Sequence, residues 1–274
     1  MSVLHILTAL RCEAQPLIEA LKLQPAANQP SEAKKPRHFV GDGIDLTIAG
    51  VGQQPMRAAV QWLQTTITTT TPTAAWLNVG IAGHPSLPLG SLRFAHQLSS
   101  EDTKKRLYPQ FTGKPPGATE RVHTVNQADL SYAQGCMVEM EAFAFFEQAR
   151  KTATAEVIGV AKVVSDNREN APEQITKQHV EELIQRQLDP ILAFATHLQQ
   201  TAHDLSQLAA DPAHFAALQS GHHFTVTQTH QLRDLLRRMS LLDSNWSPAA
   251  LTESGDARTL LAALRSALEA QVWS

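Results

Sequence analysis

The segment "AAWLNVGIAG" at residues 74–83 decides the fold class, because it is a nearly continuous apolar run with two glycines near its end. A strand that is buried on both faces has this pattern, whereas a strand with one wet face alternates apolar and polar residues. Four further runs share its character and length. They are "VLHILTAL" (3–10), "IDLTIAGVG" (44–52), "GSLRFAHQL" (90–98) and "EVIGVAKVVSD" (156–166).

Helix-like segments lie between these runs: "EAQPLIEALKL" (13–23), "QPMRAAVQWLQTTI" (54–67) and "MVEMEAFAFFEQARK" (137–151). Alternation of strand and helix predicts an α/β domain whose sheet is covered on both faces. Residues 24–38 and 99–121 are polar, and we interpret them as loops. Beyond Asp166 the patterns are helical only, and Pro190 marks a kink or a break in the first of these segments.

The composition limits the class of protein. With 274 residues, 43% of them hydrophobic and 18% charged, the chain can bury a sizeable core. A net charge of −3 gives no electrostatic reason to expect a nucleic-acid or membrane partner. The start "MSVLHILTAL" lacks the basic region and cleavage site of a signal peptide, and no run approaches the ~18 apolar residues of a membrane helix. We therefore expect a cytoplasmic protein.

Three predicted strand ends carry residues of interest, and the ends of parallel strands are where α/β proteins place ligands. Glu13 follows the first strand, where the helix dipole also favours a carboxylate as a simple cap. Gly80 and Gly83 end the strand at 74–83, and they allow either close approach to a ligand or a tight turn. Ser165 and Asp166 end the last strand, where an N-cap is the alternative.

Two carboxylates, Glu139 and Glu141, lie inside the apolar run "GCMVEMEAFAFFEQARK" at residues 135–151. In a regular helix this spacing points them about 200° apart, so they do not share one partner. If residues 136–140 are extended instead, the helix begins near Glu141. A surface helix with both acids solvated is the alternative, although the apolar neighbours leave little polar face.

Together these segments resemble the nucleoside phosphorylase/nucleosidase superfamily, and most of all its methylthioadenosine/S-adenosylhomocysteine nucleosidases. The matching pieces, in family order, are "ALRCEAQPL", "IAGVGQQPMRAAV", "LNVGIAGHPSLPLGSL", "VEMEAFAFF" and "VVSDN". The resemblance implies a three-layer sandwich around a mixed, mostly parallel sheet over residues 1–204. A helical extension over residues 205–274 lies outside the resemblance, and its role is open.

The resemblance also implies cleavage of the N-glycosidic bond of a purine nucleoside. Asp166 would protonate the purine at N7, and Glu13 would orient or deprotonate the attacking water. Glu141 would hold the ribose hydroxyls, with Met140 packing on the sugar. Carboxylates suit this reaction because positive charge develops on the ribose and negative charge on the base. The residues expected to contact substrate are Gly80, Ala82, Gly83, Glu139, Met140, Glu141 and Ser165.

Two other functions remain open. Phosphorylases of the superfamily hold phosphate with arginines in a "GDPxR"-like first segment and before the glycine turn, whereas this chain has "LRCEAQ" and Asn78-Val79 there. This difference favours water as the nucleophile, although Arg11, Arg57 and Arg93 are candidate ligands if phosphate is the co-substrate. A nucleoside-binding or scaffold protein that kept the fold without catalysis is the second alternative.

The remaining features are less informative. Tyr108, Phe111 and Tyr132 are each candidates to stack on the base, and no motif distinguishes them. The histidines at 203, 214, 222, 223 and 230 lack the spacing of a metal site, so we expect no metal. No organic cofactor is implied. The expected partners are a small-molecule nucleoside and, by resemblance, further copies of the chain in a homo-oligomer.

Overall fold

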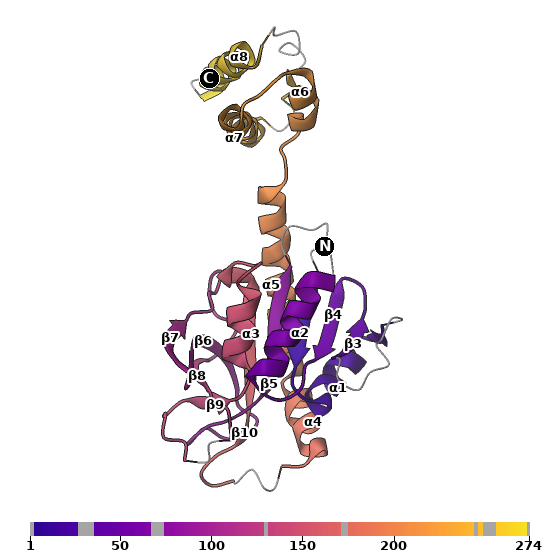
Figure 1. Ribbon diagram of the computed structural model, residues 1–274, viewed down its shortest axis with the longest axis vertical. Coiled ribbons are helices and arrows are strands. Elements are labelled where there is room, and N and C mark those ends of the chain that lie inside the picture. Colours follow the sequence, from indigo (N-terminus) through magenta and orange to yellow (C-terminus); the bar gives the residue numbers. More distant parts are fainter. Residues whose placement is uncertain are drawn as a thin grey trace. The chain divides into compact units, whose positions relative to one another are not determined.

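The computed structural model describes residues 3–26, 36–66, 74–128, 131–170, 175–243, 246–248 and 256–272. The chain divides into two compact units, Met1–Leu208 and Ala209–Ser274. The larger unit carries a sheet with helices around it, and the described part of the smaller unit is helical (Figure 1). Helix α5 (Leu188–Ala209) continues past residue 204, where the sequence analysis placed the boundary.

All five strands expected from apolar runs form. They are β1 (Leu4–Thr8), β4 (Ile44–Ile48), β5 (Ala75–Gly83), β6 (Leu92–Ser100) and β10 (Ile158–Asp166). The sheet also contains β2 (Gln24–Pro25), β3 (Arg37–Val40), β7 (Thr103–Leu107), β8 (Thr119–Thr124) and β9 (Met137–Glu139).

The loops predicted at 24–38 and 99–121 are therefore wrong in part, since β2, β7 and the starts of β3 and β8 fall in them. Residues 27–35 of the first predicted loop lie outside the described residues. Strands β2 and β7 each pair with one described strand, and a strand at the edge of a sheet keeps polar side chains in water. Strand β7 is an example, with three exposed residues in a row at its centre.

The sheet closes on itself at one end. The strand order is β10-β6-β8-β9-β5-β1-β4-β3-β2, and β10 also pairs with β5, so five strands form a ring. The expectation of a mixed sheet is confirmed, but the sheet is not mostly parallel, because the pairings among the described strands are five parallel and five antiparallel. An apolar run shows that a strand is buried, but it does not encode which edges pair or in which direction.

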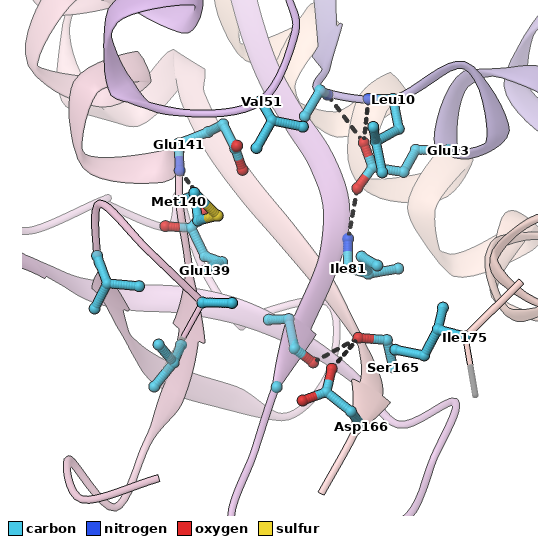
Figure 2. Close-up of a pocket in the computed structure, with 16 residues that line it drawn as sticks. Leu10, Glu13, Val51, Ile81, Glu139, Met140, Glu141, Ser165, Asp166 and Ile175 are labelled. Atoms are coloured by element: carbon cyan, nitrogen blue, oxygen red, sulfur yellow. Dashed lines mark hydrogen bonds between the residues drawn. The ribbon is translucent and has the colours of Figure 1, made fainter. Parts of the chain in front are cut away.

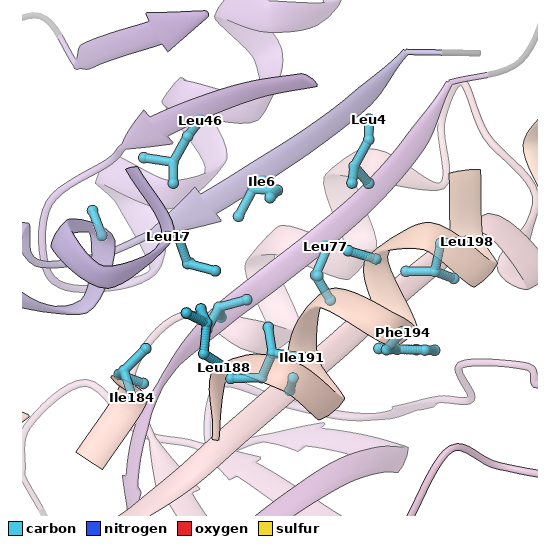
Figure 3. Packing of buried hydrophobic residues seen from close by; sticks show 14 of the residues in the cluster. Leu4, Ile6, Leu17, Leu46, Leu77, Ile184, Leu188, Ile191, Phe194 and Leu198 are labelled. Carbon is cyan, nitrogen blue, oxygen red and sulfur yellow. The ribbon is translucent and has the colours of Figure 1, made fainter. Parts of the chain in front are cut away.

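Helices cover two faces of the sheet. On one face, α1 (Arg11–Ala20), α4 (Lys177–Arg186) and α5 pack on the central strands, and Figure 3 shows Leu17, Ile184 and Ile191 in this core. On the other face, α2 (Gln53–Thr66) and α3 (Ala142–Ala149) form a second core. Each fully buried leucine or isoleucine stabilises the fold by about 1.5–3 kcal/mol, so both cores hold the strand ends in place.

The break predicted near Pro190 is present, but it precedes this residue. Helix α4 ends at Arg186 and α5 begins at Leu188, which places Pro190 in the first turn of α5. A proline is tolerated there because the first N–H groups of a helix have no partner within it.

The second unit contains α6 (Phe215–Gly221), α7 (Val226–Leu242) and α8 (Ala257–Val272). Its leucine-rich core includes Leu232, Leu236, Leu260 and Leu264. None of the helices in the described ranges has both the length and the apolar character needed to cross a membrane.

Candidate active site

A cavity of about 220 Å³ lies at the ends of β1, β5, β9 and β10 (Figure 2). Four carboxylates line it, namely Glu13, Glu139, Glu141 and Asp166. Apart from Ser165, the other lining residues are apolar or glycine, and they include Val51, Ile81, Ala82, Gly83, Met140 and Ile175. Every residue predicted to belong to the site lines this cavity except Gly80.

Glu13 is fixed by three backbone N–H groups. Its Oε2 atom accepts hydrogen bonds from Ala9 and Leu10 at 2.9 and 2.8 Å, and its Oε1 atom accepts one from Ile81 at 3.0 Å. The carboxylate therefore caps α1 and also ties it to β5. Burial raises the pKa of Glu13, and nearby Lys162 and the N–H donors only partly offset that effect. A buried carboxylate of raised pKa is a stronger base than one in water.

Gly80 does not line the cavity, but it lies directly beside the carboxylate of Glu13. A Cβ atom at this position would lie 2.8 Å from Oε1 of Glu13 and 3.2 Å from Nζ of Lys162. The missing side chain thus provides the room in which the acid and the lysine approach β5.

The acid pair lies where a strand turns into a helix, as the extended reading of residues 136–140 predicted. Strand β9 ends at Glu139, Glu141 is the N-cap residue of α3, and both are buried. The capping side chain, however, is that of Glu139. Its Oε2 atom accepts hydrogen bonds from the backbone N–H groups of Glu141 and Ala142 at 3.0 and 2.8 Å, and its Oε1 atom accepts one from the hydroxyl of Thr124.

The carboxylate of Glu141 accepts fewer hydrogen bonds than that of Glu139, so more of it is available to a ligand in the cavity. Its Oε1 atom accepts a hydrogen bond of 2.6 Å from the N–H of Gly52, at the residue before α2. Burial, together with the charge of Glu139, raises the pKa of Glu141 to about 7. The solvated-helix alternative is therefore wrong for both acids.

Lys162 neutralises part of this negative charge. Its Nζ atom lies 2.9 Å from Oε2 of Glu139, and both side chains are 2% exposed. Burial alone would lower the pKa of Lys162, but Glu139, Glu141 and Glu13 raise it above its usual value. Sequence reasoning missed this residue, although a lysine inside the apolar run at 156–166 was a signal, because a buried ammonium group requires partners.

Asp166 lies at the other end of the cavity, at the last position of β10 (Figure 2). The hydroxyl of Ser165 donates to its Oδ1 atom at 2.6 Å, and the hydroxyl of Tyr132 donates to its Oδ2 atom at 2.6 Å. A Cβ atom on Gly83 would lie 2.5 Å from Oδ2, so this glycine makes space for the acid. The simple N-cap interpretation of Ser165 and Asp166 is wrong, since no described helix begins there.

The three candidate arginines lie outside the cavity wall. Arg57 pairs with Glu147 at 2.8 Å, the guanidinium of Arg11 lies 4.8 Å from the ring centre of Phe39, and Arg93 donates to its neighbour's carbonyl. Among the described residues, those lining the cavity include no arginine or lysine.

The candidate aromatic residues are separated by the fold. Tyr108 is 51% exposed, Phe111 packs toward Phe194, and Tyr132 is buried beside Asp166. Within the described ranges, no group of three or more histidine, cysteine or acidic side chains is placed to hold a metal ion. Both cysteines, Cys12 and Cys136, are buried and unbonded to each other.

Solved structures of several known proteins have a similar fold. The 5′-methylthioadenosine/S-adenosylhomocysteine nucleosidase of Helicobacter pylori matches with a TM-score of 0.58 and 15% identity, over 72% of this chain and 98% of that chain. Futalosine hydrolase of Helicobacter pylori matches with a TM-score of 0.56 and 15% identity, over 70% and 98%. The nucleosidase of S. pneumoniae gives a TM-score of 0.54 and 18% identity, over 71% and 99%.

No protein-family model and no curated protein matches the sequence. At these low identities the similarity is one of fold alone. The chain thus has the fold of the methylthioadenosine/S-adenosylhomocysteine nucleosidases and of futalosine hydrolase, with its acidic cavity at the strand ends.

Proposed function

We propose that this protein hydrolyses the N-glycosidic bond of a purine nucleoside. The observation that carries the proposal is the composition of the cavity wall, which has four carboxylates and, among the described residues, no arginine or lysine. Such a wall stabilises the positive charge that develops on the ribose when the bond to the base breaks. It also repels an anionic nucleophile such as phosphate, which favours water over phosphorolysis.

The sugar lies at Glu141 in this proposal. Its Oε1 atom is held by Gly52, which leaves Oε2 to accept hydrogen bonds from ribose hydroxyls. Met140 lines the cavity beside it and offers an apolar surface for the ribose. Glu139 supports this end of the site, because its oxygens are engaged by backbone N–H groups, Thr124 and Lys162.

The base lies at Asp166, with Gly83 and Ala82 along its edge. A purine leaves as an anion unless a ring nitrogen is protonated, so an acid at this position lowers the barrier. Glu13 orients and deprotonates the water, because its Oε1 atom accepts one N–H bond and keeps a second lone pair for a water proton.

The test is a panel of nucleosides incubated with and without phosphate. It includes 5′-methylthioadenosine, S-adenosylhomocysteine and futalosine, since proteins of this fold are named for them. We expect free base without phosphate. Base only with phosphate would identify a phosphorylase, and binding without any base release would identify a nucleoside-binding protein.

The assignment of the acid is tested with Asp166→Asn. We expect base release to fall by about 10²- to 10⁴-fold while the far-UV circular dichroism stays unchanged. Asn126→Ala, at an exposed position outside the cavity wall, is the control. Unchanged turnover of Asp166→Asn would refute the role of Asp166.

A further inference from the structure

Tyr132 is the aromatic residue that the structure joins to the proposed acid. Its side chain is 3% exposed, and its hydroxyl donates a 2.6 Å hydrogen bond to Oδ2 of Asp166. The sequence contains two tyrosines, and the other, Tyr108, is 51% exposed. A phenol buried against a carboxylate calls for a chemical reason, because a phenylalanine would fill the same space without a polar group.

The backbone at Tyr132 is strained in order to reach this position. Its φ angle is +50°, in the left-handed region that bulky residues avoid at a cost of about 1–2 kcal/mol. Strain of this kind persists where the surrounding contacts require it, and it clusters at functional sites.

The neighbouring strand is shaped to receive the ring. A Cβ atom on Gly83 would lie 2.9 Å from Cε1 of Tyr132 and 2.5 Å from Oδ2 of Asp166. Gly83 therefore leaves room for the phenol and the carboxylate together, and a larger residue would separate them.

The two oxygens of Asp166 have unequal partners. Oδ1 accepts from Ser165, whose hydroxyl also lies 3.4 Å from the carbonyl oxygen of Ala82 and can turn to that acceptor. Oδ2 accepts from Tyr132, whose ring is confined by burial. Oδ1 is thus the oxygen that can carry a proton, because the Ser165 hydroxyl can then donate to Ala82 instead, and Oδ2 is the oxygen that stays engaged.

We propose that Tyr132 is a positioning residue for Asp166, holding Oδ2 while Oδ1 delivers its proton to the ring nitrogen of the leaving base. This inference rests on the proposed function. In the step, the O–H bond of Asp166 breaks and an N–H bond forms on the base. The electron pair of the C–N glycosidic bond goes to the base, and Asp166 is left as a carboxylate.

The phenol contributes because charge develops on Asp166 as the proton leaves. A hydroxyl donor binds an ionised carboxylate about twice as strongly as a neutral acceptor, so its bond strengthens toward the transition state. An interaction gained only in the transition state raises kcat and leaves KM nearly unchanged.

The kinetic test compares Tyr132→Phe with Tyr108→Phe. The second variant makes the same chemical change, loss of a phenolic hydroxyl, at an exposed site. We expect Tyr132→Phe to lower kcat by about ten- to a hundredfold with little change in KM. A kcat for Tyr132→Phe like that of Tyr108→Phe, or a change in KM alone, would overturn the proposal.

A second test needs no activity. In Tyr108→Phe the remaining tyrosine is Tyr132, so tyrosinate absorbance reports this phenol alone. We expect tyrosinate to form above the ordinary value of about pH 10, and to form about one pH unit lower when Asp166→Asn is added. Onset at the ordinary pH in both proteins would overturn the inference even if Tyr132→Phe fails to fold. Absence of base release by the unmodified protein would instead overturn the proposed function.

Discussion

The Nζ atom of Lys162 lies 2.9 Å from Oε2 of Glu139, and this contact joins β10 to the end of β9 in the interior of the larger unit. The same oxygen of Glu139 accepts the backbone N–H groups of Glu141 and Ala142. One carboxylate therefore partners a buried cation and also fixes the turn that presents Glu141 to the cavity. The carboxylate of Glu139 therefore contributes both to the stability of the fold and to the proposed chemistry.

Replacement of Lys162 by Met removes the cation from among three buried carboxylates. Breaking a buried ion pair by removing one partner costs about 3–5 kcal/mol, because the other charge is left unpaired. We expect the free energy of unfolding in urea to fall by that amount. The control is Arg57→Met, which breaks the Arg57–Glu147 pair, whose side chains are 38% and 26% exposed, and costs less than about 1 kcal/mol. Equal effects of the two variants would show that the Lys162–Glu139 contact does not form.

Replacement of Glu13 by Gln should cost both stability and activity. Its carboxylate accepts hydrogen bonds from three backbone N–H groups, two on Oε2 and one on Oε1. Whichever way the amide turns, its NH₂ group faces at least one of these donors. We expect a loss of about 1–3 kcal/mol in the free energy of unfolding. Wild-type stability of Glu13→Gln would argue that the carboxylate is not held by the backbone at Ala9, Leu10 and Ile81.

Replacement of Glu141 by Gln provides the contrast, since its amide oxygen can keep the bond from Gly52 and point the NH₂ group elsewhere. The pKa of Glu141 is raised to about 7, chiefly by burial. Between about pH 4.5, the ordinary value, and about pH 7, the folded chain therefore holds a proton that the unfolded chain has released. Stability falls across this window as pH rises, by about 1.4 kcal/mol per unit from this group, and then levels off.

In Glu141→Gln this decline should be smaller, and the variant should be more stable than the unmodified protein at pH 8. Some slope remains, because burial also raises the pKa of Glu13. Urea unfolding at a series of pH values measures the slope. Parallel curves for the two proteins would contradict a raised pKa at Glu141. Base release by the variant is expected to be strongly reduced, since a neutral amide stabilises the ribose cation less than a carboxylate.

Much of the sheet was predictable because a strand that is buried on both faces is a nearly continuous run of apolar residues in the sequence. The apolar runs gave five strands, and the polarity of "VEMEA" placed the turn from strand to helix near Glu141. The edge strand β7 was not predictable, since "TKKRL" has the polarity of a loop and gains its hydrogen bonds only from β6. The closure of the ring escaped prediction for a similar reason, because strand direction and pairing depend on distant partners.

The sequence by itself determined the α/β class, the positions of the strand ends and the acids that stand at them. These features were predictable because burial and the periodicity of helices and strands produce patterns among residues that are close in the sequence. Only the tertiary structure decided what each acid touches: Glu141 meets Gly52, 89 positions away, and Asp166 meets Tyr132, 34 positions away. Hydrogen bonds and charges act over a few ångströms in space, so the partners that set the behaviour of these acids appear only when the chain has folded.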